Sequence, residues 1–183
     1  MRTRTRKSTH KNIGTGSGTG PNTCNKDSGT SAVAVFKEHG IIGEVVCHNM
    51  PQKSVVITAT FTKLPQGKHG FHIHRMGDLP GNSCTGACDH FHCGPPAPHG
   101  DAPGANRPRH TGDLGNIEIN TRKAQKYFKK SYVLEGVTCE DLWGRAIIVH
   151  ADEDDLGMGG FPDSLTTGHS GARIGCAIFG RAN

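Results

Sequence analysis

Imidazole side chains are concentrated in the middle of this chain. Six histidines lie between positions 72 and 110, and the first two, His72 and His74, are separated by a single residue. Asp113 follows His110 by three residues, and His150 lies further downstream. Imidazole nitrogens and carboxylate oxygens are ligands that zinc and copper use in proteins. We therefore expect a metal centre built from this part of the chain.

The number of candidate ligands indicates two metal ions rather than one. Seven side chains qualify, and these are His72, His74, His90, His99, His110, Asp113 and His150. A tetrahedral site takes four ligands, so seven are one short of two complete sites unless one ligand is shared. An imidazole has two ring nitrogens, and His90 could complete one site and share its second nitrogen with the other. The count favours a bridged pair of metals.

Short β-type segments must position these ligands. The run 54–61 alternates apolar and polar residues, which is typical of a strand with one buried face. Similar runs occur at 32–36, 41–47, 71–75, 116–120, 145–150 and 174–179, with a more polar run near 127–134. Glycine, proline and asparagine separate the runs, and no convincing amphipathic helix is present. We expect an all-β fold, an antiparallel sandwich or barrel.

Alternation along the strands also predicts where the ligands point. In the run 71–75, the two histidines would lie on the face opposite Phe71 and Ile73, so both can bind one ion. Two long segments, 77–112 and 151–172, lack periodicity and hold or border the other metal-type side chains. Loops of this length inside a compact domain are usually functional or disordered, and the ligands favour functional loops.

Residues 1–30 differ in composition from the remainder. They hold six of the 21 basic residues and one of the 16 acidic ones, which leaves 15 of each sign in residues 31–183. Residues 1–30 are also rich in glycine, serine and threonine. This composition predicts a flexible basic tail, followed by a single domain at residues 31–183. The tail could contact nucleic acid or a membrane surface, but we expect a solvated tail with neither partner. No stretch suits a signal peptide or a membrane span, so we expect a cytoplasmic protein.

Several motifs of the chain resemble those of the copper/zinc superoxide dismutases. They are Gly70-Phe-His-Ile-His74, Cys84, His90-Phe91, His99, the run 110–116, Val149-His150, the run 154–160 and the run 171–176. The similarity extends from about residue 31 to the C-terminus, with the motifs in the same order. It implies an eight-stranded antiparallel Greek-key barrel, an immunoglobulin-like sandwich architecture with two long functional loops. It also implies dismutation of superoxide to dioxygen and hydrogen peroxide by a redox-cycling copper, in antioxidant defence, and a cytoplasmic homodimer.

The resemblance assigns roles to individual residues. It implies one copper ion per chain, held by His72, His74, His90 and His150. It implies one zinc ion per chain, held by His90, His99, His110 and Asp113, so that His90 bridges the two metals. In the same way, Asp154 would bond to the copper ligand His72 and the zinc ligand His99, Arg173 would dock the superoxide anion, and Cys84 would form a disulfide with Cys176. The other five cysteines have no assigned partner.

Two alternatives remain open from the sequence. A dismutase-like copper chaperone or metal-storage protein would need a further metal-transfer domain or a broken copper site, and neither is visible. A zinc-binding nucleic-acid module could use Cys84, Cys88, His92 and Cys93 together with the basic tail. The spacing of those four residues fits no common zinc finger, and the module leaves the copper-type histidines unexplained.

Overall fold

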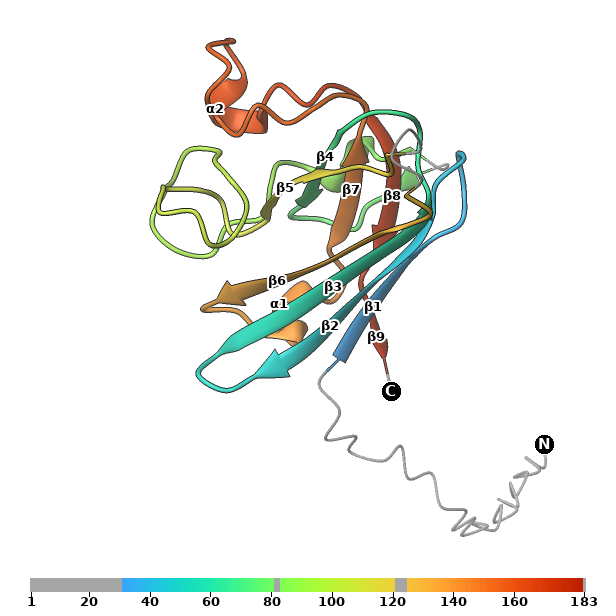
Figure 1. Ribbon diagram of the computed structural model, residues 1–183. Coiled ribbons are helices and arrows are strands. Elements are labelled where there is room, and N and C mark those ends of the chain that lie inside the picture. Colours follow the sequence, from blue (N-terminus) through green and yellow to red (C-terminus); the bar gives the residue numbers. More distant parts are fainter. Residues whose placement is uncertain (1–30, 81–82, 121–124, 183) are drawn as a thin grey trace, which may run out of the picture.

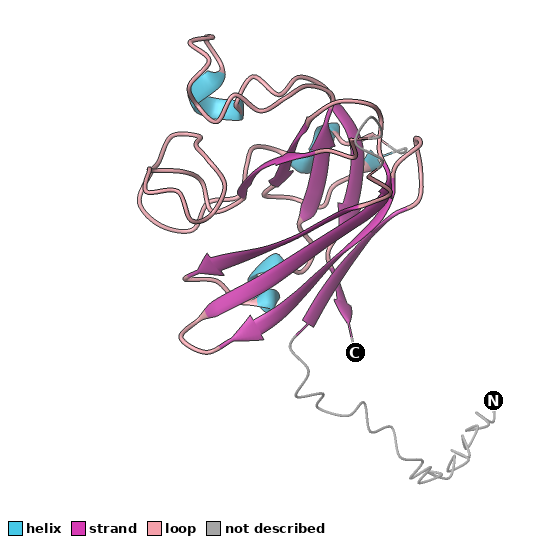
Figure 2. Ribbon diagram, viewed as in Figure 1, coloured by secondary structure: helices cyan, strands magenta, loops and turns pink. Residues whose placement is uncertain are grey.

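The computed structural model describes residues 31–80, 83–120 and 125–182, which fold into two antiparallel sheets (Figures 1 and 2). The larger sheet has the order β6-β3-β2-β1-β9, and its strands are β6 (Phe128–Glu135), β3 (Ser54–Lys63), β2 (Ile42–Met50), β1 (Ser31–Phe36) and β9 (Gly180–Ala182). The smaller sheet has the order β5-β4-β7-β8, and its strands are β5 (Asp113–Ile117), β4 (His69–Ile73), β7 (Ala146–His150) and β8 (Arg173–Ile178). The predicted tail, residues 1–30, lies outside the described residues.

The path of the chain confirms the predicted Greek-key barrel. Strands β1, β2 and β3 form a meander, and the chain then passes to the second sheet for β4 and β5. It returns to pair β6 with β3 and crosses again to pair β7 with β4. Only Phe179 separates β8 from β9, and these two segments pair into different sheets. Counted as one strand that changes sheets, they complete the eight strands that we expected.

The predicted alternation in β3 is confirmed by the packing between the two sheets. Four alternate residues of β3 have no exposed surface, and these are Val55, Ile57, Ala59 and Phe61. The ring of Phe61 lies 5.2 Å from that of Phe36 in the same sheet and 5.6 Å, edge-on, from that of Phe71 in the other. Each large apolar side chain buried in this way contributes roughly 1.5–3 kcal/mol to folding. The core therefore holds the two sheets together.

The smaller sheet is buried on both faces. Phe71 and Ile73 of β4 face the core, whereas His72 faces outward and is nonetheless fully buried. On β7, Ile148 belongs to a second apolar cluster with Cys84 and other residues of the loop that precedes β5. The long loops therefore cover the outer face of this sheet. Histidines that would be solvated in an ordinary sandwich are enclosed here.

One strand was predicted at the wrong place. The run 116–120 was expected to pair, but β5 spans Asp113–Ile117. Ile117 and Ile119 are both buried, so the alternation of apolar residues in the run 116–120 reflects burial and not strand pairing. Pairing is set by β4, where His72 lies opposite Asp113. The shift matters for the site, because it moves Asp113 from a loop onto a strand.

The helices of the described ranges are single turns that fix loops. They comprise a 3₁₀ turn at Thr85–Ala87 and two α-helical turns, α1 (Cys139–Leu142) and α2 (Ser164–Thr167). A capping box between Thr138 and Asp141 starts α1, which satisfies backbone N–H groups that a helix end leaves unpaired. No helix in the described ranges is long and apolar enough to cross a membrane.

Candidate metal centre

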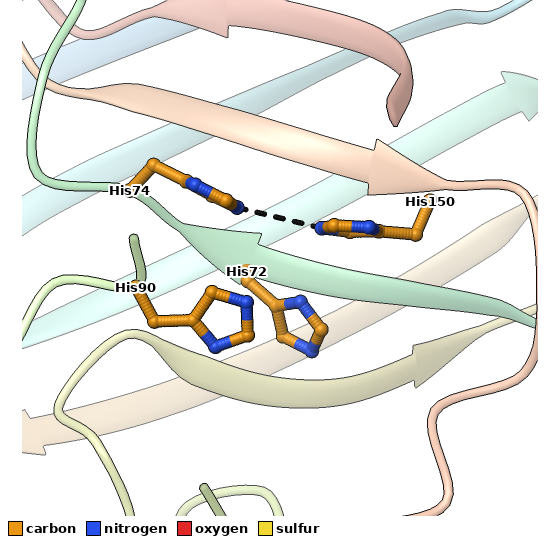
Figure 3. Close-up of side chains that lie close together, drawn as sticks. All are labelled: His72, His74, His90 and His150. Atoms are coloured by element: carbon orange, nitrogen blue, oxygen red, sulfur yellow. Dashed lines mark hydrogen bonds between the residues drawn. The ribbon is translucent and has the colours of Figure 1, made fainter. Parts of the chain in front are cut away.

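Four of the predicted ligands meet at one end of the smaller sheet (Figure 3). His72 lies on β4, His74 follows it, and His150 ends the neighbouring strand β7. His90 comes from the loop and reaches them through an isolated β-bridge with His74. One ligand nitrogen from each of the four residues lies within 4.8 Å of the others. This cluster, His72, His74, His90 and His150, has the donor set that we predicted for copper.

A second cluster shares His90 with the first. It contains His90, His99, His110 and Asp113, again with ligand atoms within 4.8 Å of one another. Oδ1 of Asp113 lies 2.8 Å from Nδ1 of His90, 3.1 Å from Nδ1 of His99 and 3.4 Å from Nδ1 of His110. Three nitrogens and one carboxylate oxygen form a set that suits zinc.

The two ring nitrogens of His90 face different clusters. Nδ1 lies beside Asp113 and 3.3 Å from Nδ1 of His99, whereas Nε2 is buried without a hydrogen-bond partner. Nδ1 of His72 is also buried without a hydrogen-bond partner among the described residues, and Nδ1 of His110 has only the long contact of 3.4 Å with Asp113. Buried polar atoms are usually hydrogen-bonded, since leaving one unpaired costs free energy. Convergent unpaired nitrogens therefore fit a pair of bound metal ions.

Asp154 contacts one histidine of each cluster, on the ring nitrogen that points away from the cluster. Nε2 of His72 donates to Oδ2 of Asp154 at 2.9 Å, and Nε2 of His99 donates to Oδ1 at 2.8 Å. The carboxylate has almost no exposed surface. By holding a proton on each far nitrogen, Asp154 leaves the near nitrogens, Nδ1 of both rings, as acceptors for a metal.

Backbone carbonyls orient the other two histidines of the copper-type cluster. Nδ1 of His74 donates to the carbonyl oxygen of Cys88 at 2.7 Å, and Nδ1 of His150 donates to that of Gly171 at 3.2 Å. The Nε2 atoms of these histidines then face each other 3.4 Å apart, as the dashed line in Figure 3 marks. All four rings of this cluster therefore present an acceptor nitrogen to a common point.

Burial keeps the copper-type histidines neutral at pH 7. Desolvation holds the pKa values of His72 and His74 far below the usual 6.5, and it lowers the pKa of His150 to about 4. Burial also lowers the pKa of His90, although the Asp113 carboxylate opposes the shift. Neutral imidazole is the form that binds a metal, so little proton release is needed on binding.

The second cluster is more strongly charged. Burial alone would raise the pKa of Asp113, but hydrogen bonds from His110, His90 and His99 lower it well below its usual range. Burial disfavours protonation of His99, yet hydrogen bonds to Asp113 and Asp154 raise its pKa to about 9. A zinc ion would replace that proton as the partner of the carboxylate.

Arg173 lies beside the copper-type cluster, in an open cavity of about 630 Å³ that His74, His90 and His150 also line. Its guanidinium donates to the carbonyl oxygens of Cys84 at 2.8 Å, Thr85 at 3.1 Å and Cys88 at 2.5 Å. These contacts hold a permanent cation where an anion would approach the histidines.

The expected disulfide between Cys84 and Cys176 is confirmed, with Cα atoms 5.9 Å apart. This bond removes Cys84 from the zinc module that we considered. Cys88 and Cys93 are exposed, and neither belongs to a potential metal cluster among the described residues. The alternative of a zinc-binding nucleic-acid module therefore loses its ligands.

Two contributors to the site were missed by sequence reasoning. Gly168 lies so close to Asp154 and His99 that an added Cβ would fall 2.0 Å from Oδ1 of Asp154. Arg109 donates to the backbone carbonyls of His110, Thr111 and Asp113, and thereby holds the turn between two predicted ligands. No sequence pattern around either residue indicated a role in the site, because both act through contacts that form only when the loops fold.

Comparisons with known proteins agree with this geometry. A family model described as copper/zinc superoxide dismutase matches residues 41–179, which include every member of both clusters. The chain is 44% identical over 156 residues to a protein of Paramecium bursaria Chlorella virus 1 named superoxide dismutase [Cu-Zn], covering 83% of this chain and 79% of the viral protein. It is 40% identical over 149 residues to superoxide dismutase [Cu-Zn] 5 of Dictyostelium discoideum, covering 81% and 95%.

Two further similarities extend the comparison. An extracellular superoxide dismutase [Cu-Zn] of Haemonchus contortus is 40% identical over 160 residues, covering 80% of this chain and 84% of that protein. Among solved structures, the crystal structure of the clock protein EA4 matches with a TM-score of 0.71 and 32% identity, covering 83% of this chain and 94% of that one. The similarity thus spans the described domain in sequence and in structure.

Proposed function

Because this chain belongs to the copper/zinc superoxide dismutase family, we propose that its two histidine clusters hold the metals of a working dismutase. The chain is an oxidoreductase that converts superoxide to dioxygen and hydrogen peroxide, and copper and zinc are its cofactors. The observation that carries the residue assignment is His90, whose two nitrogens face different clusters.

The proposed ligands follow the two clusters. Copper would be bound by His72, His74, His90 and His150, and zinc by His90, His99, His110 and Asp113. The all-nitrogen set suits copper, and the set with a carboxylate suits zinc and reduces the net charge of that site. The unpaired nitrogens of His72 and His90, and the approach of His110 to Asp113, support this division.

The chain's own residues bind the substrate and handle its protons. When bound, copper supplies the one-electron redox step, whereas zinc is redox-silent. Arg173 attracts the superoxide anion into the cavity and docks it beside the histidines. Nε2 of His90, buried and without another partner, can take up a proton and return it to the peroxide product. Asp154 keeps His72 and His99 in one tautomer throughout.

Metal titration of single variants tests the shared ligand. We expect His74→Ala to weaken copper binding alone and His110→Ala to weaken zinc binding alone. His90→Ala should weaken both and abolish most superoxide consumption. His48→Ala, an exposed histidine on β2, is the matched control and should bind one copper and one zinc per chain. Loss of only one metal in His90→Ala would refute the bridge.

We also propose that the protein is a cytoplasmic homodimer. Exposed apolar side chains near the end of the smaller sheet support pairing, since Met76 is 46% and Ile178 43% exposed. The exposed, unbonded thiols of Cys88 and Cys93 suit a reducing compartment. Analytical ultracentrifugation and cell fractionation test these proposals, and a monomer at micromolar concentration or an exported protein would contradict them.

We propose further that residues 31–183 form the dismutase domain and residues 1–30 a basic tail. The family match at 41–179 lies wholly within that domain. A chain that begins at residue 31 should keep full superoxide consumption and metal content. Lost activity in this shortened chain would place part of the function in the tail.

A further inference from the structure

Two cysteines that the proposed function does not use contact each other inside the barrel. Cys47 lies on β2 and Cys139 is the first residue of α1, 92 positions later. Their Sγ atoms are 2.7 Å apart, and neither residue has any exposed surface. A disulfide bond is about 2.05 Å long, so only a small approach of the two sulfur atoms would close one.

The approach of the two backbones is fixed by contacts that do not involve sulfur. The backbone N–H of Cys139 donates to Oδ1 of Asn49 at 2.7 Å, and Nδ2 of Asn49 donates to Oε2 of Glu140 at 3.1 Å. The capping box of Thr138 and Asp141 sets the start of α1 in the same place. The two cysteines are therefore held together before any bond forms between them.

Metal binding does not explain the pair. Two thiolates on one zinc ion, with bonds of about 2.3 Å and tetrahedral angles, would lie about 3.8 Å apart. Neither Cys47 nor Cys139 belongs to a potential metal cluster among the described residues. The remaining alternative is a pair of thiols that only fill space in the core, as small apolar side chains would.

We propose that Cys47 and Cys139 form a second intrachain disulfide, which ties β2 to α1. The oxidant would be the disulfide of a small thiol, such as oxidised glutathione. One cysteine thiolate attacks this disulfide, forms a mixed disulfide and releases one small thiolate. The second cysteine thiolate then attacks the protein sulfur of the mixed disulfide and releases the other small thiolate. The two cysteine protons pass to the released thiolates, so two small thiols and one protein disulfide result.

The buried position of the pair determines when the bond forms. Burial raises the pKa of both thiols, and thiolate is the reactive form, so exchange is slow in the folded chain. We expect the bond to form during folding or while α1 is detached, and to resist reduction afterwards. The loop that it closes, 47–139, overlaps the loop 84–176 of the first disulfide.

Peptide mapping of the folded protein tests the proposal directly. The protein is refolded with oxidised and reduced glutathione, denatured with an alkylating agent at low pH and digested with trypsin without reduction. Trypsin places Cys47 in peptide 38–53 and Cys139 in peptide 131–145, each with a single cysteine. We expect these two peptides to be joined. The link between Cys84 and Cys176 in the same digest is the internal control for oxidation.

Recovery of both peptides alkylated or carrying glutathione, with the control link intact, would overturn the proposal. A second measurement compares the original chain with the variant Cys47→Ala/Cys139→Ala, and records for each the fall in Tm between oxidised protein and protein that was reduced while unfolded and then refolded with the reductant present. The original chain should lose about 10 °C more, because it has one more long loop to open. Cys93→Ser, which removes an exposed thiol, is the matched control and should behave as the original chain. Equal losses in the original chain and the double variant would also overturn the proposal.

Discussion

Nε2 of His72 lies 2.9 Å from Oδ2 of Asp154, and neither side chain has exposed surface. The contact determines which nitrogen of His72 carries a proton, and so which one is available to a metal. Because the other carboxylate oxygen of Asp154 makes the same kind of contact with His99, one residue sets the tautomers of a ligand in each cluster.

Asp154→Asn should therefore weaken the binding of both metals. The side chain keeps its shape but loses its charge, and we expect the affinities for copper and zinc to fall roughly 10- to 100-fold. Competition with a chelator measures both affinities. Glu153→Gln removes a neighbouring surface carboxylate that pairs with Lys68 and should leave both unchanged. An effect of Asp154→Asn on copper alone would show that the carboxylate does not link the sites.

The stability of protein stripped of metal should fall with decreasing pH. The pKa of His150 is about 4 in the folded chain against 6.5 when unfolded, so below pH 6.5 the unfolded state binds more protons. Each such histidine lowers the free energy of unfolding by about 1.4 kcal/mol per pH unit over this range. Urea denaturation between pH 7.5 and 4.5 measures the slope. His150→Gln should reduce the slope and His48→Gln should not; equal slopes in all three chains would refute the assignment.

His99 should contribute in the opposite direction at higher pH. Its pKa is raised to about 9, so its contribution to stability is complete below pH 6.5 and is lost as the pH rises to 9. In metal-free protein, His99→Gln should therefore flatten the decline in the free energy of unfolding between pH 6.5 and 9. An unchanged decline would mean that the proton is not held on His99.

The disulfide should affect catalysis as well as stability. Cys84 is bonded to Cys176, and its carbonyl oxygen accepts a hydrogen bond from Arg173. We expect Cys84→Ser/Cys176→Ser to lose about 4–5 kcal/mol of stability on the chain-entropy model. It should also lower kcat/KM per bound copper, because the cation is less firmly held. Cys93→Ser is the control. An unchanged kcat/KM per copper in the double variant would show that the disulfide does not contribute to docking of the superoxide anion.

The field in the cavity should be mixed in sign. Besides Arg173, the cavity is lined by Asp89 and Asp163, and Asp163 is paired with His169 at 2.7 Å. We expect Arg173→Gln to lower kcat/KM roughly tenfold and Asp163→Asn to raise it roughly two- to fivefold at low salt. Both effects should shrink with added salt. A steep fall in the turnover of the original chain with ionic strength would contradict a mixed field.

Local patterns in the sequence predicted most of the strands, apart from the position of β5, and the direction of some ligands. The alternation around His72 and His74 was sufficient, because the two-residue period of a strand needs no tertiary information. The role of Asp154 was implied only by the family, since it lies among four consecutive acidic residues and burial alone separates it from the others. The contact of Cys47 with Cys139 was not predictable, because it depends on the packing of segments 92 residues apart.

Strand β4 separates the hydrophobic core from the candidate metal centre. Phe71 and Ile73 pack in the core on one face, while His72 and the adjoining His74 belong to the metal centre on the other. A change of volume at either apolar position would be transmitted through one backbone to the imidazoles. The affinity for a metal ion therefore depends on how firmly the packing of the core holds strand β4. At these positions, substitutions that leave the stability of the barrel unchanged would still shift the ligands and alter metal binding.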